Sequence, residues 1–68
     1  MTLREALAAA HVHSLGRGPD PAQAVARDVP RPEIMAKRAE LDAVRARSHT
    51  ARVQLAMLDR ALAVPPSP

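Results

Sequence analysis

Apolar residues recur with a seven-residue spacing along the second half of the chain. The first column of this repeat is Ile34, Leu41, Ser48, Leu55 and Leu62, and the second is Lys37, Val44, Ala51 and Leu58. Seven of these nine positions are apolar, and the two polar exceptions are Lys37 and Ser48. Two columns of this kind are typical of the seam of a coiled coil, in which a polar residue can set the register. The pattern therefore predicts one long C-terminal helix with coiled-coil character. An ordinary amphipathic helix that packs on its own chain has nearly the same spacing, so this alternative stays open.

Prolines mark both ends of the predicted long helix. Pro30 and Pro32 precede it, and prolines recur in the segment 65–68. Proline is tolerated at the first helical position but cannot continue a helix interior. No glycine or proline lies between these two groups. We therefore expect a helix over about residues 32–64, followed by an extended proline-rich tail over 65–68.

Two shorter helices are predicted in the first half of the chain. Thr2 and Glu5 have the spacing of a capping box, in which each residue satisfies a backbone N–H of the other. Gly16 is a natural stop, because glycine adopts the left-handed conformation without steric cost. Asp20 can cap a second helix, and Pro21 suits its first position.

The fold class that follows is all-α. It consists of two short N-terminal helices, about 3–15 and 21–28, and one long C-terminal helix, about 32–64. We expect residues 1–64 to form a single small helical domain or a helical hairpin, with the first helix folded back on the long one. Apolar surface that remains on the long helix is expected to be covered by another chain.

Composition favours this need for a partner. The chain has 68 residues, no cysteine and no aromatic residue, so its core can contain only aliphatic side chains and alanine. A chain of this length buries only about 60% of its unfolded surface and is marginally stable alone. We expect a protein partner or self-association through the seam. The partner-binding residues predicted for it are Ile34, Leu41, Val44, Ala51, Leu55, Leu58 and Leu62.

The net charge of +3 comes from the second half of the chain. The charges of interest there are Arg38, Arg45, Arg47 and Arg52. Arginines beside an apolar seam are typical of charges that select a partner helix. A basic helix face can also contact phosphates, so a small nucleic-acid-binding regulator is the alternative function. The absence of aromatic residues that could stack on bases makes that alternative the weaker one.

No catalytic, metal or cofactor site is predicted. His11 and His13 lie two positions apart, so on a helix they point about 200° away from each other and cannot share an ion. Ser48 and Thr50 adjoin His49, but adjacent helical side chains do not face one another. The sequence therefore indicates a protein that is not an enzyme.

The function expected from these patterns is a non-enzymatic interaction or assembly subunit, such as an adaptor or a small component of a larger complex or virus particle. The uncharged run from Ala6 up to Arg17 is too short to span a membrane and contains two histidines. Glu5 interrupts any apolar region that a signal peptide would need. A cytoplasmic location, or a place in a virus particle, is the resulting expectation.

Overall fold

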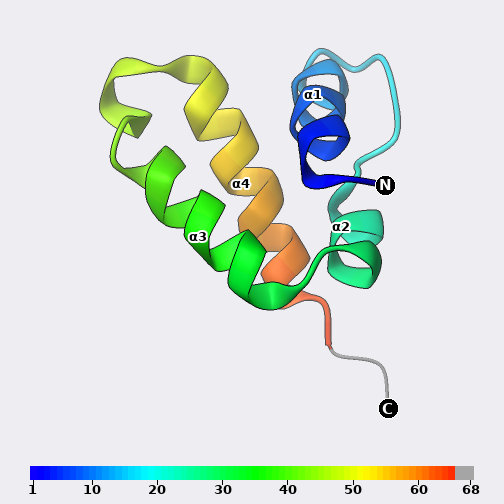
Figure 1. Ribbon diagram of the computed structural model, residues 1–68. Coiled ribbons are helices and arrows are strands. Elements are labelled where there is room, and N and C mark those ends of the chain that lie inside the picture. The colour runs from blue at the N-terminus through cyan, green and yellow to red at the C-terminus, as the bar shows by residue number, and fades with distance from the viewer. Residues whose placement is uncertain (66–68) are drawn as a thin grey trace.

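The computed structural model describes residues 1–65 of the chain, and these residues confirm the all-α fold class. Figure 1 shows how the helices follow one another along the chain. The elements in chain order are α1 (Leu3–Ser14), α2 (Ala22–Asp28), α3 (Arg31–Asp42), the short 3-10 helix η1 (Arg45–Arg47) and α4 (His49–Ala63). The radius of gyration is 11.2 Å, which is the size expected of a compact domain of this length.

Helix α4 lies at the centre of this arrangement. It packs against α1, α2 and α3, while α1 and α2 also contact each other. In Figure 1, α3 and α4 run side by side in opposite directions, with α1 and α2 on the other side of α4. The sequence predicted that the first helix would fold back on the C-terminal segment, and the contact between α1 and α4 confirms it.

The core consists of aliphatic side chains and alanines from all four α-helices. Its largest fully buried side chains are Val25, Ile34, Met57 and Leu58. Alanines of α1 also belong to the core, because Ala6 and Ala10 are almost completely buried where α1 meets its neighbours. Small residues at these positions let helices approach closely, so a core without aromatic rings can still be closely packed.

Local signals define α1 as the sequence predicted. The Thr2 hydroxyl accepts a hydrogen bond from the backbone N–H of Glu5 at 3.2 Å, and the Glu5 carboxylate accepts one from the Thr2 N–H at 3.0 Å. These two bonds complete the capping box. At the other end, Gly16 has a φ of +75°, which only glycine adopts easily.

Helix α2 also begins and ends close to its predicted bounds. The Asp20 carboxylate accepts a hydrogen bond from the backbone N–H of Ala22 at 3.1 Å. The same carboxylate also forms an ion pair with α4, because Arg60 donates hydrogen bonds to both of its oxygens at 2.7 and 3.0 Å. The N-cap of α2 is Pro21 and not Asp20 as predicted, because the Asp20 carboxylate bonds the N–H of Ala22 from one position further back and joins the start of α2 to the central helix.

The prediction of one long helix over residues 32–64 is wrong. The chain leaves the α-helical path after Asp42, passes through η1, and begins α4 at His49. Ser48 has an extended backbone, with φ −141° and ψ 115°, and its hydroxyl accepts a hydrogen bond from the N–H of Ala51 at 3.1 Å. Ser48, predicted as a polar residue of the seam, is instead the N-cap of α4.

Burial of apolar surface explains why the chain bends without a glycine or a proline. A single helix over this stretch would leave its apolar stripe facing solvent. The bend instead places Ile34 of α3 in one core cluster with Leu58 of α4, and Leu41 and Leu62 pack against that cluster. Each buried aliphatic side chain contributes about 1.5–3 kcal/mol, which exceeds the small helix preference of the residues at the turn. Four of the seam residues thus share one core within a single chain, and the structure shows no coiled coil in residues 1–65.

The predicted extended tail lies mostly outside the described residues, which end with the exposed Pro65. Among the helices of the described part, none has both the length and the apolar character needed to cross a lipid bilayer.

Candidate functional site

The seven seam residues divide between the interior and its edge. Ile34, Ala51, Leu55 and Leu58 are all less than 10% exposed, and Leu41, Val44 and Leu62 are half-buried. The first four therefore offer almost no free surface in this fold. Contact of the seven residues with a second chain stays a prediction, since a single chain does not test it.

The predicted charges lie mostly around the connection between α3 and α4. We call Arg45, Arg47 and Arg52 the turn arginines. Arg45 pairs with the Asp42 carboxylate at 3.2 Å, and Arg52 donates a hydrogen bond to the carbonyl of Arg45 at 2.6 Å. These two contacts link the end of α3 and the start of α4 to η1, while the turn arginines remain exposed to solvent.

Arg38 lies four residues before Asp42, a spacing that predicts an ion pair within α3. Instead of pairing within α3, its guanidinium binds the Asp59 carboxylate of α4. This contact raises the pKa of Arg38, first through the hydrogen bond and then through the attraction between the charges. Arg38 therefore joins the two antiparallel helices and is less available to an external partner than the turn arginines are.

A groove with a volume of about 540 Å³ opens between α2, the first turn of α3 and the end of α4. We call it the α2–α3 groove. Its apolar floor consists of Ala26, Val29, Ile34, Ala61 and Val64. Its rim consists of Gln23, Arg27, Pro30, Arg31 and Pro65. The groove therefore combines an apolar floor with a rim that has two positive charges and no negative one.

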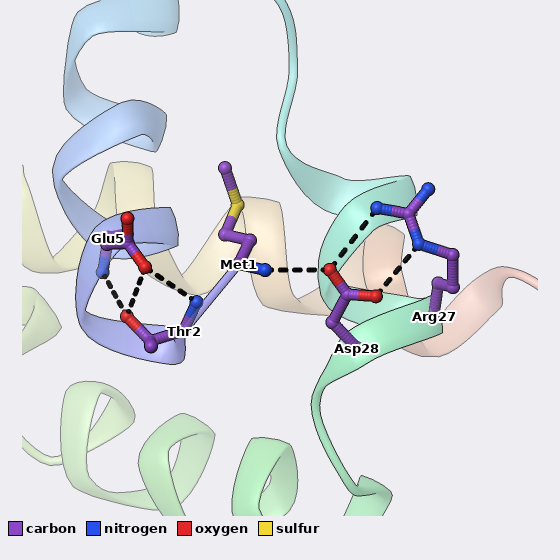
Figure 2. Close-up of polar contacts among 5 residues, drawn as sticks. All are labelled: Met1, Thr2, Glu5, Arg27 and Asp28. Atoms are coloured by element: carbon purple, nitrogen blue, oxygen red, sulfur yellow. Dashed lines mark hydrogen bonds and ion pairs between the residues drawn. The ribbon is translucent and has the colours of Figure 1, made fainter.

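A small network of polar contacts orients one of these two charges. Figure 2 shows the Asp28 carboxylate between the guanidinium of Arg27 and the α-amino group of Met1. Arg27 donates to both carboxylate oxygens, at 2.8 and 3.2 Å, and the α-amino group donates at 2.8 Å. The hydrogen bonds from Arg27 and from the α-amino group hold the pKa of Asp28 well below its usual range. Asp28 is thus ionised at neutral pH and holds Arg27 at the edge of the groove.

The second charge lies on the short connection between α2 and α3. Arg31 is the first residue of α3 and stands between Pro30 and Pro32, which restrict the backbone on both sides. Its guanidinium donates to the carbonyl of Leu62, near the end of α4, at 3.5 Å, the limit of hydrogen-bond distance. Arg31 therefore reaches across the groove toward α4 while keeping most of its donors free.

A second hollow of about 440 Å³ lies beside the α3–α4 turn. Arg45 and Arg52 line it together with Ala46, Leu55, Ala56 and Asp59. It is shallower than the α2–α3 groove, and its lining contains charges of both signs. For these reasons we regard the α2–α3 groove as the stronger candidate for a binding site.

The histidines of α1 lie apart from both hollows. The Nδ1 atom of His13 is 2.8 Å from the carbonyl of Gly18, so this ring fastens the turn that follows α1. Within residues 1–65 there is no group of three or more His, Cys, Asp or Glu side chains arranged to hold a metal ion.

Reasoning from the sequence alone missed the α2–α3 groove. The groove is lined by segments that are more than 30 residues apart, such as Arg31 and the end of α4. One local signal pointed to it, because the segment Pro30-Arg31-Pro32 prevents α2 and α3 from forming one continuous helix. The break between the two helices leaves a hollow beside the end of α4, which the pattern of apolar positions does not reveal.

Comparison of the chain with models of protein families, with curated proteins and with solved structures finds no match in any of the three.

Proposed function

We propose that this protein is a non-enzymatic binding module, an adaptor or small assembly subunit, that takes up a segment of a partner protein in the α2–α3 groove. The observation that carries this proposal is the groove itself, a concave surface with an apolar floor and a polar rim. Concave apolar surfaces with a few polar groups at their edge are typical of sites that bind peptides and other ligands.

The groove replaces the seam as the proposed binding surface. Leu58 is fully buried and Leu55 is 6% exposed, so a partner helix would reach them only if α3 or α4 moved away. The groove is open in the folded chain. It therefore allows the interaction function that the sequence indicated without the cost of unfolding part of the core.

The floor of the groove belongs to the core and is held in place by it. Val29, Ile34 and Ala61 are each less than 10% exposed and are part of the same apolar cluster. A surface that is ordered before binding loses little conformational freedom when a ligand arrives, so more of the contact energy appears as affinity.

The test is selection of a random peptide library on the immobilised protein, with an Ala26→Gln variant used for counter-selection. Ala26 is half-buried in the groove floor, so the larger amide side chain should obstruct a bound peptide. We expect peptides that bind the native protein, lose at least tenfold in affinity for the variant, and shift the amide resonances of the groove residues in nuclear magnetic resonance spectra.

The matched control is Ala8→Gln. It makes the same change at an exposed position of α1 that does not line the groove. Circular dichroism should show that both variants keep their helicity. Failure to select any peptide that contacts the groove, or equal binding to the two variants, would contradict the proposed function.

The second candidate function is nucleic-acid binding. The observation that favours it is the α3–α4 turn, which brings the exposed turn arginines together at one end of the molecule. Arginine binds phosphate well because its planar guanidinium can donate two parallel hydrogen bonds. We rank this function second because two of the turn arginines already bond to their own chain.

A further inference from the structure

The charge of the α2–α3 groove indicates what kind of segment it binds. Arg27 and Arg31 are the charged residues among those that line the groove, and both are positive. The rest of the lining is apolar apart from Gln23. A ligand that complements this surface therefore has apolar groups for the floor and a negative charge at the rim.

Arg27 is available to such a ligand. Its side chain is 73% exposed, so a carboxylate can approach the guanidinium from solvent. Asp28 neutralises it only in part, because the Asp28 carboxylate also accepts a hydrogen bond from the α-amino group of Met1 (Figure 2). A guanidinium has five N–H donors, and Asp28 takes two of them, which leaves donors free for a second acceptor.

Arg31 is positioned to act together with Arg27. The two residues are separated by the short turn between α2 and α3, and both lie on the groove rim. The bond from Arg31 to the Leu62 carbonyl, at 3.5 Å, is weak and uses one donor. A carboxylate accepts hydrogen bonds from arginine in a bidentate geometry, which makes it the natural partner for these free donors.

We propose that the occupant of the α2–α3 groove is an extended segment of a partner protein in which an Asp or Glu side chain stands beside apolar side chains. This inference rests on the proposed function, because it names the chemistry of the segment that the groove takes up. The apolar side chains lie on the floor over Ala26 and Val64, and the carboxylate binds at Arg27 and Arg31.

The experiment uses peptides selected from the library, each made in two forms. One form keeps its Asp or Glu residues, and the other has Asn or Gln in their place. Isothermal titration with the full chain should show that the acidic form binds about tenfold more tightly than the amide form. Higher salt should weaken binding of the acidic form alone, because salt screens exposed charges.

The double variant Arg27→Gln, Arg31→Gln separates the charge effect from the rest of the groove. For this variant we expect the two peptide forms to bind equally, since the partner of the carboxylate is gone while the apolar floor is unchanged. The matched control is Arg4→Gln, Arg17→Gln, which removes the same number of charges outside the groove and should preserve the tenfold preference.

The possible failures are distinguishable. If peptides bind the groove but the two forms have equal affinity for the native chain, the inference is wrong and the proposed function stands. If no peptide binds the groove, both are wrong. A variant that lacks residues 66–68 tests a different occupant. Tightening of the acidic peptide by more than tenfold on this deletion would show that the chain's own tail occupies the groove, and would overturn the proposal.

Discussion

Substitutions at Ser48 test the bend between α3 and α4, because the bend decides whether Ser48→Ala or Ser48→Gly is the more stable variant. In the structure Ser48 is an N-cap, and its hydroxyl accepts a hydrogen bond from the half-buried N–H of Ala51 at 3.1 Å. Ser48→Ala removes this bond and should cost about 1 kcal/mol of unfolding free energy, whereas Ser48→Gly should cost only a few tenths. At an N-cap, glycine is therefore better than alanine.

A continuous helix through residue 48 would reverse this order. In a helix interior alanine is the most favourable residue, and glycine is less favourable by about 1 kcal/mol. Ser48→Ala would then stabilise the protein by about 0.5 kcal/mol relative to serine. The two arrangements therefore differ in which of the two variants is the more stable.

The assay is urea denaturation followed by far-ultraviolet circular dichroism, because the chain has no aromatic residue for fluorescence. Equal slopes of free energy against urea would show that the same surface is exposed in each variant. Ala39→Gly, at an exposed position within α3, is the control and should cost about 1 kcal/mol. A Ser48→Ala variant that is more stable than Ser48→Gly by a similar amount would refute the bend.

Three further predictions follow from contacts described above. Leu58→Ala leaves a cavity at a fully buried site and should lower the unfolding free energy by about 2–5 kcal/mol in the same urea assay. Leu15→Ala, at a position 59% exposed, should change it by less than about 0.5 kcal/mol, and equal losses for the two variants would contradict the described core. The hydrogen bonds from Arg60 lower the pKa of Asp20 from its ordinary value of 3.8, so this pair stabilises the fold above that pH and its contribution is lost as the pH falls further. The urea midpoint should therefore fall less steeply with decreasing pH for Arg60→Gln than for the native chain, and identical pH profiles would contradict the pairing. If the turn arginines contact duplex DNA, a plot of log affinity against log salt concentration should have a slope of about −3. This slope should largely disappear when all three arginines are changed to Gln while helicity is retained, and undetectable binding at about 0.15 M salt would exclude this function.

The bounds of α1 could be predicted because its signals are local. The hydrogen bonds between Thr2 and Glu5 and the positive φ of Gly16 involve residues within one or two turns of each other. Their energies do not depend on the rest of the fold, so spacing along the chain is enough to identify them. The all-α class was predictable for the same reason.

The bend at Ser48 was hidden because the same residues suit two arrangements. Ile34 and Leu58 have the spacing of a coiled-coil seam, and the same spacing lets them meet when α3 and α4 fold against each other. A serine cap is weak beside the burial of several aliphatic side chains, so local preference does not decide between the two. The α2–α3 groove was hidden for a related reason, since it exists only after the chain has bent.

The central position of α4 has a consequence for the order of folding. Gln54 donates to the carbonyl of Leu7, 47 residues earlier, and Arg60 binds Asp20, 40 residues earlier. The three preceding α-helices each pack on α4, so most of the apolar surface of α1 and α2 has no partner until α4 has been synthesised. The tertiary packing of α1 and α2 therefore depends on α4, the last helix of residues 1–65.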